Sequence, residues 1–390
     1  MSYNSNIRDD KYIVMLNRDA SALTLDIHLL DVSFGVDTFN DNQTINSIDH
    51  IFRIEGAYGY AGRFEPRLVE QIRKDPGVAF VEVDTVMYAQ NVERGAPWGL
   101  ARVSRRNALE YSGTNRYFYD ARGGENVTAY IIDTGINWKH EDFQGRASWG
   151  KTIPPYEEDE DGHGHGSHCG GTVAGFKYGV AKKAKVVGVK VLGSDGSGTT
   201  SDVIKGIEWA VKAAKKEAEE AKRTGRKHKG SVANMSLGGG YSRALNRVLN
   251  AAVQQGLHFA VAAGNEDQDA CHTSPASAEL AITVGATDIA DYRAWFSNWG
   301  SCVDIFAPGV DITSTWNDGK NSTNTISGTS MASPHVAGVL AYILSMAEEP
   351  LTNKELRAKL IELATSGVLD DIPRSTPNRL AYTNPPKGFY

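Results

Sequence analysis

The chain has 390 residues, of which 41% are apolar and 23% charged, and its formal net charge is −6. This length predicts about two or three domains, and the composition is that of an ordinary globular protein. A negative net charge offers no basic surface of the kind that nucleic-acid-binding domains carry. No apolar run approaches the ~20 residues that span a bilayer. We therefore expect neither a nucleic-acid partner nor a membrane span.

The first part of the chain, up to about residue 90, is predicted to form a small α+β unit. Strand patterns occur at residues 11–16 and 50–56, and residues 65–77 have apolar side chains at helical spacing before a Pro-Gly end. Residues 78–89 then alternate in the manner of a half-buried strand. Residues 90–99 are polar and contain Gly and Pro, which favours a linker.

Beyond this linker, apolar strand patterns alternate with helical patterns. Strands are predicted at residues 128–133, 184–192, 231–237, 258–264 and 281–286, and helices at 201–223 and 243–256. The alternation predicts an α/β fold, a doubly wound and mostly parallel sheet with helices on both faces. Ligands bind such sheets beyond the carboxyl ends of the strands. Asp133, residues 236–240 and residues 264–265 should therefore lie around one crevice.

The stretch GHGHGSHCGG places His163, His165 and His168 within six residues, with Cys169 next to the last. Three imidazoles are compatible with zinc in number, because zinc takes nitrogen and sulfur ligands. The alternatives are one catalytic base between bystanders, or a crowded helix start. Zinc ligand clusters usually come in pairs along the sequence, and no second cluster is visible here.

Two other glycine-rich motifs carry an acid and a serine. Asp133 ends an apolar strand before Thr-Gly, where a buried carboxylate is costly unless a charged or hydrogen-bonding group meets it. Its simpler interpretation is a helix cap or a turn. Ser330 opens a long apolar helix that has Pro334 in its first turn. It should lie beside free backbone N–H groups, although a lone serine there is usually an N-cap.

The three motifs DTG, GHGSHCGGTVAG and GTSMASPHVAG carry Asp133, His165 and Ser330 in that order. Together they resemble the subtilisin superfamily of serine peptidases, and specifically its proteinase K-like branch. The resemblance extends from PWGLARVS at Pro97 almost to the C-terminus. It implies a subtilisin-like fold and a serine endopeptidase with an Asp-His-Ser triad and an acyl-enzyme mechanism. The other two histidines then become bystanders, and Cys169 a buried structural thiol.

The resemblance also assigns roles around the triad. Asp133 orients His165, the general base for Ser330, and Asn265 supplies an oxyanion donor beside the Ser330 backbone N–H. Two backbone segments hold the substrate as an added strand. The substrate-binding residues are expected to be Gly196, Ser197, Gly198, Ser236, Leu237, Gly238, Ala262, Gly264 and Thr273. The walls of the first pocket, Ala262 to Gly264 and the region around Thr273, are small and uncharged. They favour broad cleavage after apolar or aromatic residues. The rival is a binding protein without catalysis on the same scaffold.

Residues 1–90 resemble the inhibitor-like propeptide of this family through DKYIVML, KDPGV and FVEVD, and residues 91–390 its peptidase domain. The resemblance implies a zymogen that cuts itself near residues 88–91. Its partners would be protein and peptide substrates and its own propeptide, acting as an intramolecular inhibitor, and the enzyme would be a monomer. The family is mostly secreted or vacuolar. Because the polar start shows no secretory signal, an intracellular location stays open.

Catalysis by this family needs no cofactor, but the resemblance implies a structural calcium ion. Asp304, with the carbonyls of Glu279 and Ala281, would bind it through hard oxygen ligands; Asp304 could instead be only a surface carboxylate. Cys271 and Cys302 match positions that are bridged in some relatives, which implies a disulfide with Cys169 left free. Two reduced thiols are the alternative in a cytosolic protein. The charged stretch 222–229 is interpreted as a solvated insertion, with a nuclear signal or an anion-binding patch as the alternative. Residues 157–162 are interpreted as a solvated loop whose charge attracts cations.

Overall fold

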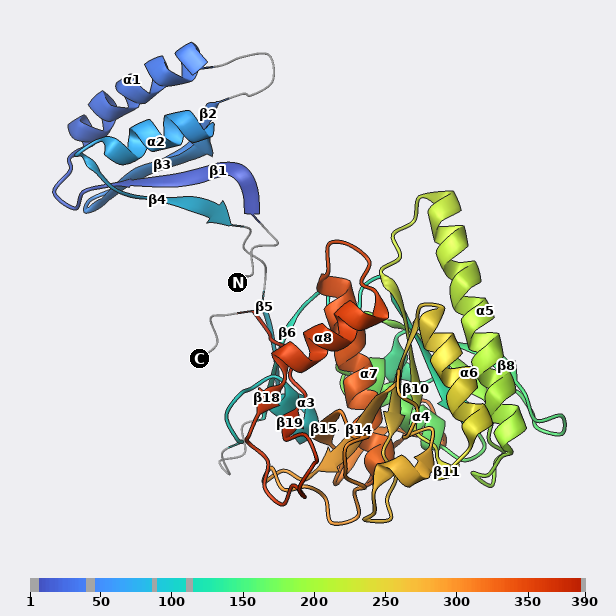
Figure 1. Ribbon diagram of the computed structural model, residues 1–390. Coiled ribbons are helices and arrows are strands. Elements are labelled where there is room, and N and C mark those ends of the chain that lie inside the picture. The colour runs from blue at the N-terminus through green and yellow to red at the C-terminus, as the bar shows by residue number, and fades with distance from the viewer. Residues whose placement is uncertain (1–6, 40–45, 86–89, 110–114, 387–390) are drawn as a thin grey trace. The chain divides into compact units, whose positions relative to one another are not determined.

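The computed structural model describes residues 7–39, 46–85, 90–109 and 115–386 (Figure 1). The chain divides into two compact units, Met1–Tyr88 and Ala89–Tyr390. Within the described residues, no helix combines the length and the apolar character that a membrane crossing requires.

The first unit has the element order β-α-β-β-α-β (Figure 1). Its elements are β1 (Ile7–Leu16), α1 (Ala22–Phe39), β2 (Ser47–Ile54), β3 (Ala57–Arg63), α2 (Pro66–Lys74) and β4 (Val78–Thr85). The sheet is antiparallel in the order β2-β3-β1-β4. Val14, Tyr60, Leu68 and Ile72 are buried together between sheet and helices. The strands near residues 11–16, 50–56 and 78–89 and the helix at 65–77 were predicted; α1 and β3 were not.

The second unit is built on a nine-stranded sheet in the order β18-β19-β15-β14-β12-β10-β7-β9-β8. The strands are β7 (Val127–Asp133), β8 (Ala147–Thr152), β9 (Lys185–Lys190), β10 (Gly230–Met235), β12 (Leu257–Ala262), β14 (Ile282–Thr287), β15 (Ile305–Pro308), β18 (Thr365–Ser366) and β19 (Arg379–Leu380). All neighbours are parallel except β18 and β19. The predicted doubly wound α/β fold is therefore confirmed.

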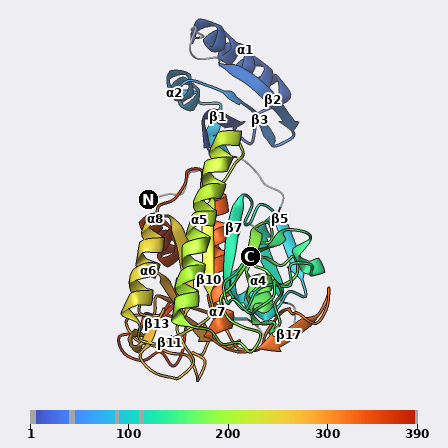
Figure 2. The same cartoon turned by 90° about the vertical axis from the view of Figure 1, so that its right-hand side faces the viewer.

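Helices cover both faces of this sheet (Figures 1 and 2). They are α3 (Trp98–Val103), α4 (His165–Ala174), α5 (Thr200–Thr224), α6 (Arg243–Gln254), α7 (Thr329–Met346) and α8 (Asn353–Leu363). Helices α5 and α6 pack on one face, and α4 and α7 on the other. In β7, Tyr130 and Ile132 pack in the core beneath α5 and α6, and Ala129 and Ile131 pack in the core on the other face, beneath α4 and α7. A strand buried on both faces needs this continuous apolar run.

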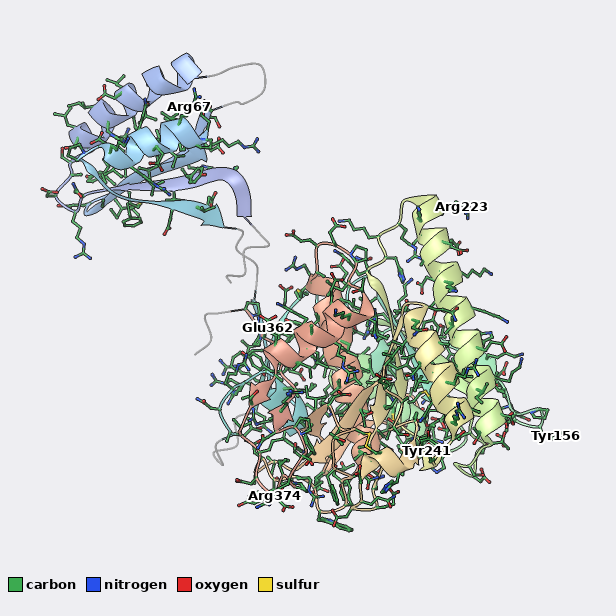
Figure 3. All side chains as sticks on the ribbon, viewed as in Figure 1. Arg67, Tyr156, Arg223, Tyr241, Glu362 and Arg374 are labelled. Atoms are coloured by element: carbon green, nitrogen blue, oxygen red, sulfur yellow. A yellow bond between two sulfur atoms is a disulfide. The ribbon has the colours of Figure 1, made fainter. Side chains whose placement is uncertain are left out.

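Three short two-stranded sheets complete the unit: β5 (Gln90–Arg94) with β6 (Arg116–Asp120), β11 (Gly239–Gly240) with β13 (Thr273–Ser274), and β16 (Ile312–Thr315) with β17 (Thr323–Ile326). The charged end of α5 is exposed, with Arg223 at its tip (Figure 3). Gly225, at φ +69°, ends the helix. Residues 222–227 are solvated as predicted, whereas His228 and Lys229 are half-buried.

Candidate active site

Asp133 and His165 meet at the carboxyl end of β7. Asp133 is the last residue of this strand and is fully buried. His165 is the first residue of α4, and its Nδ1 lies 2.8 Å from Asp133 Oδ1. Burial of the imidazole would lower its pKa, but the charge and hydrogen bond of Asp133 outweigh burial. The pKa of His165 is therefore raised above its ordinary value.

Asp161 holds the start of α4 in place, a role that the sequence did not reveal. Its side chain is only 7% exposed. It accepts hydrogen bonds from the Gly164 N–H at 2.8 Å, the Ser167 hydroxyl at 2.6 Å and the Thr134 hydroxyl at 2.8 Å. Burial would raise the pKa of Asp161, yet these donors hold it below its usual value. The interpretation of residues 157–162 as wholly solvated is wrong at this position, because free N–H groups at a helix start attract a carboxylate.

Ser330 is the second residue of α7 and lines the same cavity as His165. Its hydroxyl donates to the Ser236 carbonyl at 3.2 Å, and the Ser236 hydroxyl donates to the Ser330 carbonyl at 2.7 Å. The Ser330 hydroxyl is thus turned toward Ser236. Catalytic hydrogen bonds are often poorly aligned without substrate and tighten when it binds, so this geometry is compatible with a serine that His165 deprotonates during attack.

Asn265 is held so that its amide NH₂ stays available. Its Oδ1 accepts the Thr329 N–H at 2.8 Å and the Thr329 hydroxyl at 2.9 Å. The turn from β12 into Asn265 needs Gly264, which has φ +103°, and a Cβ there would lie 2.3 Å from Asn298 Nδ2. The Ser330 N–H belongs to the first turn of α7, where N–H groups have no partner within the helix. Two donors can therefore serve one developing oxyanion.

His165 and Ser330 line one cavity of about 590 Å³, whereas Asp133 and Asn265 lie outside its lining. Six of the expected substrate-binding residues line it: Gly196, Ser197, Gly198, Ser236, Leu237 and Gly238. Ala262, Gly264 and Thr273 lie outside this lining. Ala262 is buried at the end of β12, and Thr273 pairs with Gly240. His163, which the sequence analysis treated as a bystander, also lines the cavity. Its position two residues before His165 could have indicated that it lies at the cavity.

The histidine cluster does not form a zinc site. His168 is fully buried, and its Nε2 lies 2.9 Å from the Ile312 carbonyl. Burial lowers the pKa of His168 to about 4. In the part of the chain that the structure describes, Asp133, His165 and Cys169 are the only His, Cys, Asp or Glu side chains that gather closely enough to hold a metal. Two of these, Asp133 and His165, already contact each other. Burial raises the pKa of the Cys169 thiol, which fits a structural residue.

The disulfide expected from the resemblance is confirmed, whereas the calcium ligands are not arranged for an ion. Cys271 and Cys302 are bridged, with Cα atoms 5.3 Å apart, and Cys169 is free and buried. Asp304, instead of facing an empty cage, forms an ion pair with Arg357. The same guanidinium donates to the Glu279 carbonyl at 2.8 Å. Because a cation already lies between two of the expected ligands, the residues present do not fit calcium.

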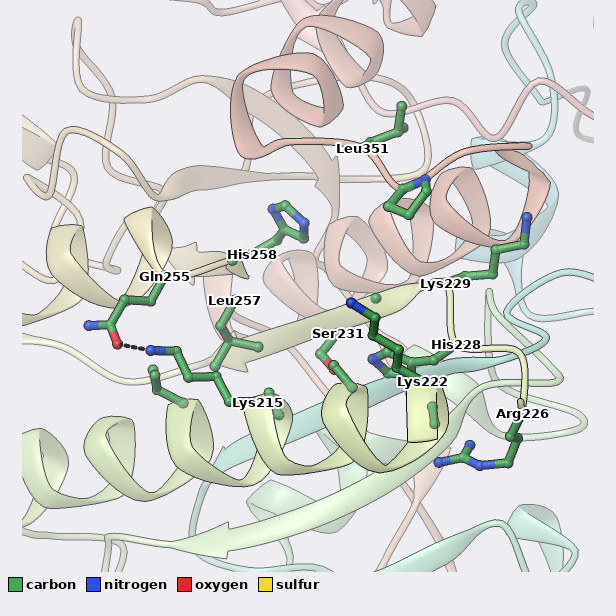
Figure 4. A pocket seen from close by; sticks show the side chains of 17 residues that line it. Lys215, Lys222, Arg226, His228, Lys229, Ser231, Gln255, Leu257, His258 and Leu351 are labelled. Atoms are coloured by element: carbon green, nitrogen blue, oxygen red, sulfur yellow. Dashed lines mark hydrogen bonds between the residues drawn. The ribbon is translucent and has the colours of Figure 1, made fainter. Parts of the chain in front are cut away.

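A second cavity, of about 410 Å³, lies at the opposite ends of the strands (Figure 4). It is bounded by α5, by Ser231 and Leu257 at the beginnings of β10 and β12, and by Leu351 before α8. Lys215 and Gln255 both line this cavity, and the Lys215 ammonium donates to the Gln255 side chain at 2.6 Å (Figure 4). Asp133 lies at the other end of the same sheet, as the last residue of β7, so this cavity is separate from the Asp133–His165 contact.

Comparisons with known proteins agree with this geometry. The model of the Subtilase family matches residues 124–381, and that of Peptidase inhibitor I9 matches residues 11–90. The relative named Subtilisin-like serine protease Pen c 2, from Penicillium citrinum, is 56% identical over 362 residues, which cover 90% of this chain and 78% of the relative. Alkaline protease 2 of Aspergillus fumigatus is 56% identical over 348 residues, covering 86% of this chain and 70% of the relative.

A solved structure described as a cold-adapted subtilisin-like serine proteinase is also similar. It has a TM-score of 0.66 and 45% sequence identity, and the match covers 74% of this chain and 98% of the other. The fold, the site and these matches agree with one another. The chain therefore belongs to the subtilase family: it is a subtilisin-like serine protease, a hydrolase of peptide bonds, with an inhibitor I9 unit ahead of its catalytic unit.

Proposed function

We propose that this protease is an endopeptidase, made as a zymogen that processes itself, in which Asp133, His165 and Ser330 form the catalytic triad. The observation that carries the proposal is the 2.8 Å contact of buried Asp133 Oδ1 with Nδ1 of His165, a histidine that lines the same cavity as Ser330. A serine hydroxyl is a weak nucleophile at its free pKa, so it needs an adjacent base to act.

In the first half of the reaction, His165 Nε2 takes the proton of Ser330 Oγ as this oxygen attacks the peptide carbonyl. Asp133 holds the ring through Nδ1 and stabilises the imidazolium that forms. The carbonyl oxygen becomes an oxyanion, to which Asn265 Nδ2–H and the Ser330 N–H donate. His165 then gives the proton to the leaving amine, and the acyl-enzyme remains.

In the second half, water replaces the departed amine. The water oxygen attacks the ester carbonyl while His165 takes a proton from the water. The same two donors stabilise the second oxyanion. Collapse returns the proton to Ser330 Oγ and releases the carboxylic acid product. Asp161 contributes indirectly by anchoring the first turn of α4. It is a positioning residue.

The cleft is suited to an extended peptide. Segments 196–198 and 236–238 both line it, and a Cβ built at Gly239 or Gly240 meets no heavy atom within 4 Å. Glycine therefore leaves room for a substrate backbone to pair as an added strand. The wall near Ser330 is formed by Ser236, Leu237 and Gly238, which carry no charge. An uncharged wall favours broad cleavage after apolar or aromatic residues. We propose that the enzyme acts as a monomer.

Residues 1–90 would act as chaperone and temporary inhibitor, and the cut would fall near residues 88–91. Tyr88 and Ala89 lie outside the described residues, and Gln90 and Asn91 begin β5. The bridged pair Cys271–Cys302 supports maturation in an oxidising compartment, because disulfides persist there and are rare in the cytosol. A secreted or vacuolar location fits this requirement.

The proposal is tested by titrating the processed enzyme with a serine-directed phosphonylating reagent. We expect one equivalent to abolish hydrolysis of a peptide substrate, with the adduct on the peptide that contains Ser330. Full activity after stoichiometric labelling, or an adduct on another serine, would contradict it. The same titration distinguishes an enzyme from a binding protein on this scaffold, which would not react.

A further inference from the structure

The carboxylate of Asp304 is fixed at the junction of two strands. Asp304 directly precedes β15, and its N–H donates to the Thr283 carbonyl of β14 at 2.9 Å. The Thr283 N–H donates in return to Asp304 Oδ2, also at 2.9 Å. Only Oδ1 is left for another partner. Because both strands belong to the central sheet, this oxygen has a defined position near the Glu279 carbonyl.

Arg357 bridges these two oxygens. Its Nη1 donates to the Glu279 carbonyl at 2.8 Å, and its Nη2 donates to Asp304 Oδ1. The planar guanidinium presents its N–H groups as a rigid fork, so one side chain can satisfy two acceptors held apart by the backbone. Calcium would instead need six to eight oxygens at about 2.3–2.6 Å. It cannot occupy the same space as the guanidinium.

Helix α8 delivers Arg357 to this place with little freedom. A capping box fixes the start of the helix: the Thr352 hydroxyl accepts the Glu355 N–H at 3.3 Å, and the Glu355 carboxylate accepts the Thr352 N–H at 2.8 Å. Leu356 and Leu360 anchor the helix in the core. Arg357 thus starts from a rigid backbone.

The position requires a cation. The Asp304 side chain is 14% exposed, and that of Arg357 is 34% exposed. Burial raises the pKa of Asp304, and the guanidinium opposes this effect. A buried carboxylate without a partner is strongly destabilising. A guanidinium supplies a permanent positive charge, which does not depend on the concentration of any free ion.

We propose that Arg357 is a built-in replacement for the structural calcium ion of the fold family, and that removing its guanidinium uncovers a calcium site formed by Asp304 and the Glu279 carbonyl. The catalytic unit of the natural protein then owes no stability to calcium at this position. The variant without the guanidinium gains a dependence on calcium that the natural protein lacks.

The test compares thermal unfolding with a chelator and with millimolar calcium chloride. Full-length protein carrying Ser330→Ala avoids self-digestion. All seven tryptophans lie between Trp98 and Trp316, so tryptophan fluorescence follows the catalytic unit alone. We expect the parent protein to unfold at the same temperature in both buffers. Arg357→Ala should unfold several degrees lower in chelator and recover part of this loss in calcium, but not in magnesium.

Two variants serve as controls. Lys359→Ala removes another cation from the same helix, which pairs with Glu362 at 3.3 Å, and should show no response to calcium. Arg357→Lys keeps the charge but cannot bridge both oxygens, so it should lose stability without gaining a calcium response. If Arg357→Ala does not fold, the stability of Arg357→Lys in chelator still tests whether the guanidinium bridge stabilises the catalytic unit.

Two results would overturn the proposal. One is a calcium response of the parent protein that Asp304→Asn abolishes. The other is an Arg357→Ala protein that responds to calcium no more than Lys359→Ala does. If Arg357→Ala does not fold, an Arg357→Lys protein that is as stable in chelator as Lys359→Ala overturns the proposal instead.

Discussion

Thr329 donates both its backbone N–H and its hydroxyl to the same oxygen of Asn265, at 2.8 and 2.9 Å. The occupied oxygen fixes which side of the Asn265 amide carries the NH₂ group. A Cβ at Gly328 would lie 3.7 Å from this nitrogen and 3.6 Å from the Ser330 nitrogen, so the two nitrogens are near each other. Thr329, the residue before Ser330, therefore sets the orientation of the proposed oxyanion donor.

Removing the Asn265 amide should lower kcat far more than removing the Thr329 hydroxyl that orients it. We expect Asn265→Leu to lower kcat by about 10²–10³-fold with little change in KM, because the hydrogen bond strengthens in the transition state. Thr329→Val deletes two hydrogen bonds of the hydroxyl, the one it donates to Asn265 and the one it accepts from the Gly264 N–H. The loss of the bond to Asn265, worth about 0.5–1.5 kcal/mol, should lower kcat roughly 2- to 10-fold. Steady-state kinetics on a peptide substrate measure both. Losses confined to KM would show that Asn265 binds the ground state instead.

The acid limb of the pH profile should lie above the ordinary histidine value of about 6.5. His165 acts as a base only when neutral, and Asp133 raises its pKa, so activity should be lost as the pH falls through this raised value. Asp133→Asn removes the charge, which should move the limb to lower pH and reduce kcat by orders of magnitude. An acid limb that stays in place in Asp133→Asn would contradict this assignment.

The sequence predicted most of the catalytic unit, because strands buried on both faces leave long apolar runs and because the triad motifs are specific. It did not predict β8, β15 or α8 of that unit, and residues 90–94, which were expected in a linker, form β5. In the first unit it did not predict α1 or β3. Strand β3 contains Gly59 and Gly62, which lower its strand signal, yet a Cβ at Gly59 would lie 2.4 Å from the Val14 carbonyl. The need for glycine is set by a neighbouring strand far away in the sequence.

Asp161 and Arg357 were missed for the same physical reason. Each looks like a surface charge in its own segment. Asp161 is buried because it binds the first turn of α4. Arg357 contacts Asp304, which is 53 residues away in the sequence. The resemblance supplied the expected calcium ligands, but it could not show that Arg357 lies between Asp304 and the Glu279 carbonyl.

The bridge between Cys271 and Cys302 should contribute about 2–4 kcal/mol to the free energy of unfolding, since it closes a loop with a sequence separation of 31. We expect Cys271→Ser with Cys302→Ser to lower stability in denaturant by this amount. Mass spectrometry of a non-reduced digest should show the cross-linked peptide pair. If the digest contains only the two separate peptides, the bridge does not form.

Oxidation of Met331 should lower turnover, because a polar sulfoxide would lie directly beside Ser330. Met331 is only 1% exposed, whereas Met346 is half-buried. Peroxide should therefore oxidise Met346 first without loss of activity, and activity should fall in step with Met331 sulfoxide, as followed by peptide mass spectrometry. Met331→Leu should resist inactivation. Full activity with Met331 oxidised would refute this prediction.

Self-processing is the central claim, and the fate of the Ser330→Ala chain tests it most directly. Wild-type protein, purified and followed by intact mass, should separate into two pieces cut near residues 88–91. Ser327→Ala, which alters an exposed serine three residues earlier, should be processed like the wild type. Ser330→Ala should stay at full length, because only the nucleophile is lost while the two units keep their folds. Rapid cutting of purified Ser330→Ala protein at the same bond, with contaminating proteases excluded, would contradict the account.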